Sequence, residues 1–266
     1  MNERCVTYEL KGQIAFIGLN RPEKRNAINR ELFLQLAEAV AKAEEEANVG
    51  VIFGHGSQFS SGLDLAFAAD DLLKMDPALR KRRPDLSRIA FDSIARGVIP
   101  WIAALHGPVV GAGFELAATA HVRVADETAF FALPECARGI FVGGGGSVRI
   151  QRLIGTSRMT DMMLTSRTYS AQDAEGFGAV QYLVAPGEAL AKASELAQKI
   201  AGNAALSNYA VSAIMPRIAD MPVDEGLFYE RVAAEYIITA ESSERMRAFL
   251  EKRSAPLERP ANPGKE

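Results

Sequence analysis

Two glutamates, Glu115 and Glu135, stand in segments that suit acid–base chemistry. Glu115 follows a small-residue turn, residues 111–113, that predicts the start of a helix. The first N–H groups of a helix have no partner inside it, so a carboxylate there lies beside donors that can hold a developing negative charge. Glu135 precedes four glycines, residues 143–146. A second carboxylate directed at the same place supplies both an acid and a base, which suits proton transfer at a carbon beside a carbonyl.

Each of these features also has a purely structural interpretation. Glycines at 111 and 113 allow close packing of a helix start, and an acid such as Glu115 stabilises the dipole of a first turn. Glu135 stands three residues before Arg138, a spacing at which the two could form a surface ion pair. A dinucleotide-binding loop is not indicated, because Leu116 occupies the place of its third glycine.

The composition is that of a globular protein, with 48% of the 266 residues hydrophobic and 24% charged. A formal net charge of −3 gives no general attraction to nucleic acid or to anionic membranes, so we expect neither as a partner. The basic run at 80–83 is the exception, and is either a solvated loop face or a contact with an anionic ligand. No apolar stretch reaches the ~18 residues of a membrane span, and no secretory signal is visible.

Cysteine and histidine are too few to dominate the chemistry. The two cysteines, Cys5 and Cys136, cannot form a disulfide scaffold and indicate a reducing compartment, so we expect a cytoplasmic protein. Cys136 is interpreted as a small buried packing residue rather than a nucleophile. The three histidines have no metal-ligand spacing, and no metal site is expected.

Hydrophobic periodicity and turn residues predict an α/β body followed by helices. Asn29 is expected to cap a helix that runs to about residue 47, and Ser170 with Asp173 has the form of a capping box. The other predicted elements are strands at 6–10, 13–19, 49–54, 99–105, 122–125, 128–132 and 180–184, and helices at 87–97, 111–120, 146–154, 157–164, 186–201, 204–219, 222–240 and 242–252.

Three regions follow from this pattern. Residues 1–200 are predicted to form the core with the site, residues 201–253 a helical region, and residues 254–266, which carry three prolines, a loose tail. Within the core, residues 66–84 are highly charged and are expected to be irregular.

Several motifs, in this order, resemble those of the crotonase (enoyl-CoA hydratase/isomerase) superfamily. The resemblance covers about residues 5–253, and the combination is specific although no single motif is. The matching segments are residues 19–28 (LNRPEKRNAI), 59–65 (FSSGLDL), 106–117 (HGPVVGAGFELA), 133–135 (LPE), 152–155 (RLIG) and 248–253 (AFLEKR).

The resemblance implies an α/β spiral of ββα turns and a helical C-terminal region that builds trimers, often paired into hexamers. It also implies a coenzyme A thioester substrate, whose thioester oxygen is held by two backbone N–H groups. The matching positions are Leu63 and Ala112. Donors fixed at a helix start need no reorganisation as an enolate forms, and one such donor is worth on the order of 3 kcal/mol.

Hydratases of the superfamily use two glutamates, and these fall on Glu115 and Glu135. The resemblance therefore implies a lyase that adds water syn across a 2-enoyl-CoA, with Glu115 as base, Glu135 as acid and no metal or redox cofactor. Two nearby carboxylates titrate as a pair, so one can stay protonated near neutrality. The positions expected along the coenzyme A are Lys24, Arg25, Ala27, Ser61, Gly62, Asp64, Leu65 and Gly111.

Two alternatives stay open at this point. One is another crotonase reaction, either double-bond isomerisation or the hydration and retro-aldol cleavage of a hydroxycinnamoyl-type substrate. The paired glutamates favour hydration, since isomerases can manage with one acid. The other is a CoA-thioester or RNA-binding protein without turnover, which the acidic charge balance and the intact glutamates oppose. Leu63, Ala112, Phe114 and Val142 depart from common family residues, so the acyl group is not determined.

Overall fold

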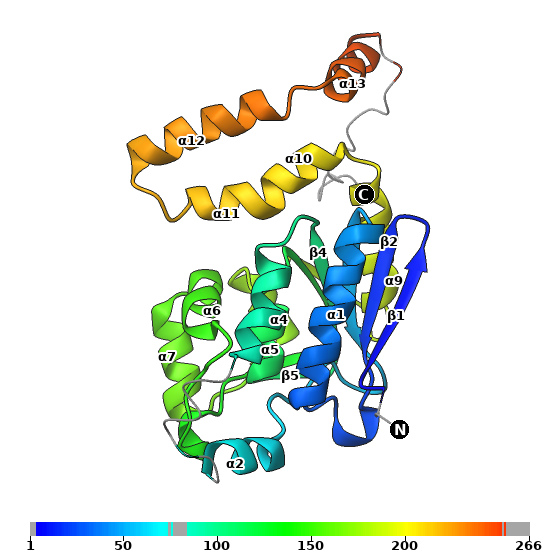
Figure 1. Ribbon diagram of the computed structural model, residues 1–266. Helices are drawn as coiled ribbons and strands as arrows, with labels where there is room; N and C mark the ends of the chain where they lie inside the picture. The colour runs from blue at the N-terminus through cyan, green and yellow to red at the C-terminus, as the bar shows by residue number, and fades with distance from the viewer. Residues whose placement is uncertain (1–3, 74–75, 77–83, 252, 254–266) are drawn as a thin grey trace, which may run out of the picture. The chain divides into compact units, whose positions relative to one another are not determined.

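The computed structural model describes residues 4–73, 76, 84–251 and 253 (Figure 1). The chain forms two compact units, Met1–Ala213 and Ile214–Glu266. The domain division predicted after residue 200 stays a prediction, and the basic run at 80–83 and the tail at 254–266 lie outside the described residues. Over the part of the chain that is described, helices fall short of the length and apolarity needed to cross a membrane.

The first unit is built on a six-stranded sheet with the order β1-β2-β3-β4-β6-β9. The first two strands form an antiparallel hairpin, as the sequence predicts, and the following neighbours are all parallel. The strands are β1 (Val6–Lys11), β2 (Ile14–Leu19), β3 (Val49–Gly54), β4 (Trp101–Leu105), β6 (Val122–Asp126) and β9 (Tyr182–Val184).

Both faces of this sheet are covered by helices, which explains its continuous apolar strands. Figure 1 shows α1 (Arg30–Glu46) and α4 (Leu86–Ala95) side by side on one face. Successive strand residues point to opposite faces, so Ile17 packs into the cluster with α1 and α4, while Phe16 packs into the cluster with α9 (Ala189–Ala201) on the other face.

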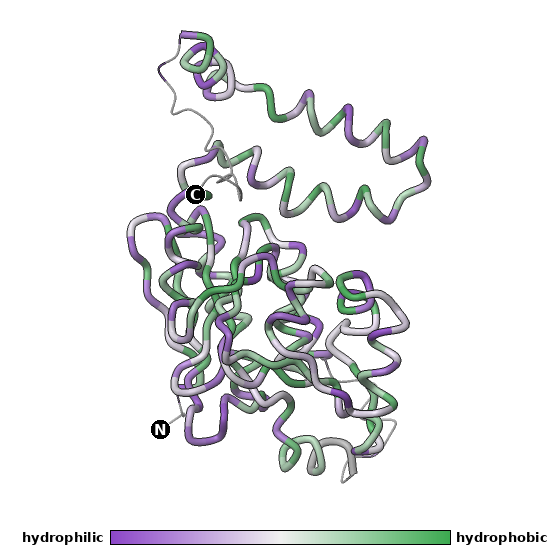
Figure 2. Tube along the Cα trace, turned by 180° about the vertical axis from the view of Figure 1, so that it is seen from behind, coloured by the Kyte–Doolittle hydropathy of each residue, from purple (hydrophilic) through white to green (hydrophobic). Residues whose placement is uncertain are grey.

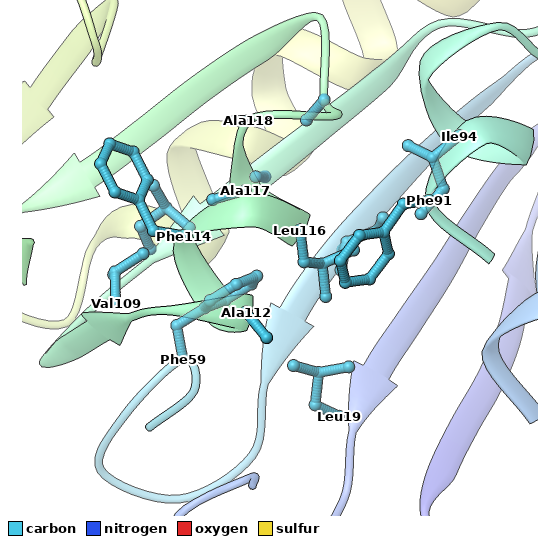
Figure 3. Close-up of a cluster of buried hydrophobic side chains, with 14 of the residues drawn as sticks. Leu19, Phe59, Phe91, Ile94, Val109, Ala112, Phe114, Leu116, Ala117 and Ala118 are labelled. Atoms are coloured by element: carbon cyan, nitrogen blue, oxygen red, sulfur yellow. The ribbon is translucent and has the colours of Figure 1, made fainter. Parts of the chain in front are cut away.

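A second, three-stranded sheet carries the segments that hold the glutamates. Its order is β5 (Pro108–Val110), β7 (Phe130–Ala132) and β8 (Tyr169–Ser170), with β5 and β7 parallel. The sequence analysis missed β5 and β8, because two or three residues are too few to show a strand periodicity. A buried apolar cluster, drawn in Figure 3, fixes this sheet and the short helix α5 (Ala112–Ala117) to the rest of the unit.

The predicted helix starts are confirmed in detail. The Asn29 side chain accepts a 2.9 Å hydrogen bond from the N–H of Leu32 at the start of α1. Ser170 and Asp173 form both bonds of a capping box at α8 (Ala171–Gly176). Two predictions were wrong: the stretch expected to be irregular contains α2 (Leu65–Leu73), and the helix expected at 111–120 ends at residue 117.

The helices expected at 146–154 and 157–164 are confirmed, whereas those expected after residue 203 are shorter and more divided than predicted. The helix expected at 204–219 is interrupted by a π-helical turn, Ala210–Ile214. The helices not yet named are α6 (Gly146–Ile154), α7 (Thr156–Thr165), α10 (Ala205–Tyr209), α11 (Met215–Ile218), α12 (Val223–Tyr236) and α13 (Ala240–Leu250). Figure 2 shows hydrophobic and hydrophilic residues alternating along the helices of the second unit.

Candidate active site

Helix α5 places Glu115 in the interior. All six of its residues are buried, and Glu115 is 4% exposed. The helix begins after Gly111, whose φ of 53° lies in the region that favours glycine. One carboxylate oxygen of Glu115, Oε1, accepts a 2.8 Å hydrogen bond from the N–H of Gly146, the first residue of α6. A Cβ on residue 146 would lie 2.8 Å from this oxygen, so the close approach requires glycine there.

Glu135 approaches from the neighbouring strand. Strands β5 and β7 pair in parallel with Val110 opposite Ala132, so the segments that continue to Glu115 and Glu135 leave the sheet from the same edge. Glu135 is 6% exposed, and its Oε2 finds no hydrogen-bond partner among the described residues. A side chain so buried is not the surface half of an ion pair with Arg138, and that interpretation was wrong.

The residue after Glu135 corrects another prediction. Cys136 begins a short 3-10 helix, Cys136–Arg138, and is exposed rather than buried. The turn that buries the Glu135 side chain directs its neighbour outward, and local sequence gives no sign of this. Cys5, the other cysteine, is buried in the main core.

The two glutamates share a cavity of about 540 Å³. Gly111 and Ala112 from the start of α5, and Gly62 and Leu63 from the loop after β3, form the wall beside them. Gly143 and Gly144 of the glycine run also line it. Much of the remaining wall is apolar, formed by Phe33, Leu65, Phe67, Leu86, Phe91, Ile140 and Phe141.

Two backbone donors face this cavity without a protein partner. Among the described residues, none accepts a hydrogen bond from the N–H of Leu63 or of Ala112. The Cβ that a side chain at residue 62 would add lies 3.5 Å from the nitrogen of Ala112, so the two donor segments approach closely. Free N–H groups at a helix start are suited to holding an oxyanion.

Ser60 joins the two segments that carry these donors. It pairs in parallel with Val109, with hydrogen bonds on both sides of it, to Pro108 and from Val110. Its buried hydroxyl donates to the carbonyl of Asn26 at 2.8 Å and accepts from the N–H of Gly62 at 3.2 Å. The spacing of the Leu63 and Ala112 donors is therefore fixed by backbone pairing rather than by flexible side chains.

The surroundings shift both carboxyl groups in the same direction. Burial, and then the negative charge of Glu115, raises the pKa of Glu135 from 4.5 to about 7. Burial also raises the pKa of Glu115, although the N–H groups of residues 143, 144 and 146 and the charge of Arg149 oppose this. Glu135 therefore carries its proton more readily than Glu115, which has donors to hold its charge.

A second cavity, of about 500 Å³, adjoins the first and shares Leu63, Leu65 and Arg138 with it. The other positions expected along the coenzyme A lie around this second cavity: Lys24, Arg25, Ala27, Ser61 and Asp64. Asp64 also forms a 3.1 Å ion pair with the buried Arg21, which lowers the pKa of Asp64 despite its partial burial. Its carboxylate therefore also anchors the loop, a structural role that the sequence analysis did not foresee.

Sequence reasoning missed the residues that support the glycine run. Arg149 of α6 forms a 2.9 Å ion pair with Asp92 of α4 and also donates to the carbonyl of Gly144. The ring of Phe91 also packs against Gly144, where a Cβ would lie 2.6 Å from it. The four consecutive glycines could have indicated such a support, because a run of glycines needs contacts from other residues to hold one conformation.

Comparison with known proteins agrees with this architecture. A sequence profile of the enoyl-CoA hydratase/isomerase family matches residues 9–260. The 2,3-dehydroadipyl-CoA hydratase of Escherichia coli (strain K12) is 34% identical over 259 residues, which cover 96% of this chain and 98% of that protein.

Two solved structures extend the likeness to the fold. A crystal structure of a "putative enoyl-CoA hydratase" from Rhodopseudomonas palustris CGA009 has a TM-score of 0.87 at 43% identity, covering 94% of this chain and 95% of that one. The enoyl-CoA hydratase from Bacillus anthracis has a TM-score of 0.85 at 28% identity, covering 93% and 96%. The crotonase-like fold predicted from the motifs is confirmed, and the chain belongs to the enoyl-CoA hydratase/isomerase family.

Proposed function

We propose that this protein is an enoyl-CoA hydratase, which adds water syn across the double bond of a 2-enoyl-CoA to give a 3-hydroxyacyl-CoA. One observation carries the proposal: two buried glutamates share a cavity with two unpartnered backbone N–H groups. The Escherichia coli relative bears the name of a hydratase, which supports the same reaction.

The unequal environments of the glutamates support a division of roles. Glu115, whose Oε1 accepts from Gly146, is the base that removes a proton from water. The resulting hydroxide oxygen bonds to the β-carbon, and the π electrons move onto the thioester oxygen. Glu135, with a pKa of about 7, is the acid that delivers its proton to the α-carbon. The cycle ends with Glu115 protonated and Glu135 ionised, and proton exchange with solvent restores the starting state.

The N–H groups of Leu63 and Ala112 hold the thioester oxygen in this scheme. Negative charge on that oxygen is greatest in the enolate, so donors already fixed in place favour the transition state over the substrate. Each donor is worth on the order of 3 kcal/mol, and backbone donors place no demand on the side chain at either position.

The second cavity is proposed to take the coenzyme A portion. It adjoins the first at Leu63, so a thioester held there can continue into it. Lys24 and Arg25 lie on its wall and supply positive charge for phosphate groups. We propose no metal or redox cofactor, because addition of water involves no net oxidation or reduction and the acid, base and oxyanion donors are groups of the protein itself; coenzyme A is part of the substrate.

The test is a screen of the purified protein against crotonyl-CoA, a long-chain 2-enoyl-CoA and a cinnamoyl-type CoA ester. Hydration removes the conjugated absorbance, and the product gains the mass of one water. We expect both changes together for at least one ester. Loss of conjugation at unchanged mass would mean isomerisation, and a lighter CoA ester released with an aldehyde would mean retro-aldol cleavage. No change with any ester would overturn the proposal.

A further inference from the structure

The glycine run at residues 143–146 holds Glu115 but has no side chains to hold itself. Gly146 donates to Oε1 of Glu115 at 2.8 Å, while Gly145 has a φ of 95° and is fixed through its carbonyl, which accepts from the N–H groups of Val148 and Arg149 at the start of α6. Glycine loses more conformational freedom on ordering than any other residue, so a run of four needs support from elsewhere.

Arg149 supplies that support by bridging two elements. One guanidinium nitrogen, Nη1, lies 2.9 Å from Oδ1 of Asp92 on α4, and the other, Nη2, donates to the carbonyl of Gly144. The side chains of Arg149 and Asp92 are only 17% and 25% exposed. Gly144 thus contacts both the ring of Phe91 and the guanidinium of Arg149.

A second arginine shows that neutralising Asp92 is not the whole role of Arg149. Arg88 also pairs with Asp92, at 3.1 Å, but its side chain is 60% exposed, and its hydrogen bonds among the described residues do not reach the glycine run. Asp92 thus keeps a cation without Arg149, whereas the polar link from the Gly144 carbonyl to Asp92 is lost. The planar guanidinium of arginine can donate to two acceptors at once in a fixed geometry, which the single ammonium group of lysine does not provide.

We propose that Arg149 is a positioning residue, which fixes the glycine run so that the Gly146 N–H holds Glu115 in place as the base. The inference rests on the proposed hydratase function. The charged groups around Glu115 are Glu135 and Arg149, with Arg138 acting on Glu135, and with Asp92 and Arg88 behind Arg149. Arg149 and the loop amides both lower the pKa of Glu115, so losing Arg149 raises that pKa.

The kinetic test compares Arg149→Met with Arg88→Met, its matched control on the same carboxylate. For Arg149→Met we expect kcat to fall about ten-fold, since misplacing a catalytic group is costly, with KM little changed. The acidic limb of its kcat–pH profile should move up by about one unit, because the base then needs a higher pH to ionise. Arg149→Lys should recover only part of the loss, and Arg88→Met should match wild type. Equal effects of Arg149→Met and Arg88→Met on kcat and on the pH profile would overturn the proposal.

A second measurement does not depend on turnover. Hydrogen exchange of the Gly146 amide should be faster in Arg149→Met than in wild type and unchanged in Arg88→Met, because only the former frees the loop. If the wild type hydrates no enoyl-CoA, the proposed function fails while this comparison still decides the role of Arg149. Equal exchange in the two variants would refute it. If Arg149→Met does not fold, Asp92→Asn replaces it, because this change weakens the ion pair that holds Arg149. The same two measurements, the kcat–pH profile and the exchange of the Gly146 amide, are then compared with those of Arg88→Met.

Discussion

Replacing Glu135 by glutamine should make the protein more stable at alkaline pH while removing its proposed acid. Glu135 is 6% exposed, and within the part of the chain that the structure describes its Oε2 has no hydrogen-bond partner. Burial and the nearby charge of Glu115 raise the pKa of its carboxyl. The folded protein therefore favours the neutral form. Glutamine is neutral at every pH and has nearly the same shape.

The sign and size of the effect follow from the shifted pKa. A pKa raised on folding means that the contribution of the neutral acid is fully present below 4.5 and is lost as the pH rises through about 7. At 1.36 kcal/mol per unit, the difference between 4.5 and about 7 corresponds to about 3 kcal/mol. Glu135→Gln avoids this loss, so its stability relative to wild type should rise by about 2–3 kcal/mol between pH 4 and pH 8.

The assay is urea unfolding of both proteins at pH 4, 6 and 8, at one fixed protein concentration, because any self-association contributes to stability. Only the change with pH matters, since a constant offset from the amide group cancels. The same variant should lose at least ~100-fold in kcat if Glu135 is the acid. A stability difference that stays constant from pH 4 to pH 8 would show that Glu135 is not a buried carboxyl held neutral.

Three further predictions concern the base, the oxyanion donors and assembly. Glu115→Gln should lower kcat by at least ~100-fold with little change in substrate binding, and near-wild-type turnover would make Glu115 structural. Ala112→Pro should abolish activity while the protein stays folded, because proline removes one N–H donor yet is tolerated at the first position of a helix. Ala112→Gly is the control and should stay active. Full turnover of the proline variant would show that this N–H does not hold the thioester oxygen. The protein should form a trimer or hexamer, because large apolar side chains of α12 and α13 are exposed in the single chain, including Leu227 at 59% and Phe249 at 66%. Light scattering that gives a stable monomer of 28.7 kDa would refute this.

Local features of the sequence predicted local features of the fold. The cap at Asn29 and the capping box at Ser170 depend on side chains within three residues of the backbone they bond, so the sequence contains the whole interaction. The central strands were predictable for a related reason: sheet residues buried on both faces form continuous apolar runs. The high charge of residues 66–84 led us to expect an irregular segment where α2 forms, because acidic and apolar residues are mixed there over a short stretch.

The site required information that spacing along the chain does not carry. Glu115 and Glu135 meet because β5 and β7 pair in parallel, and each of these strands has only three residues. Motif resemblance pointed to Glu115 and Glu135, and to Leu63 and Ala112 as the predicted oxyanion donors, without that pairing. It gave no indication of the link from Arg149 to Asp92, which joins residues far apart in the sequence through α4 and α6. The outward direction of Cys136 likewise depends on how its turn packs.

The most direct test of the central claim is a crystal structure with butanoyl-CoA, the saturated counterpart of crotonyl-CoA, which cannot be hydrated. We expect its thioester oxygen to lie within about 2.7–3.1 Å of the nitrogens of both Leu63 and Ala112. The α- and β-carbons should lie beside the carboxylates of Glu115 and Glu135, with the coenzyme A portion in the second cavity. A thioester oxygen bound away from both amides, or an acyl chain that does not reach the two glutamates, would contradict the proposed site.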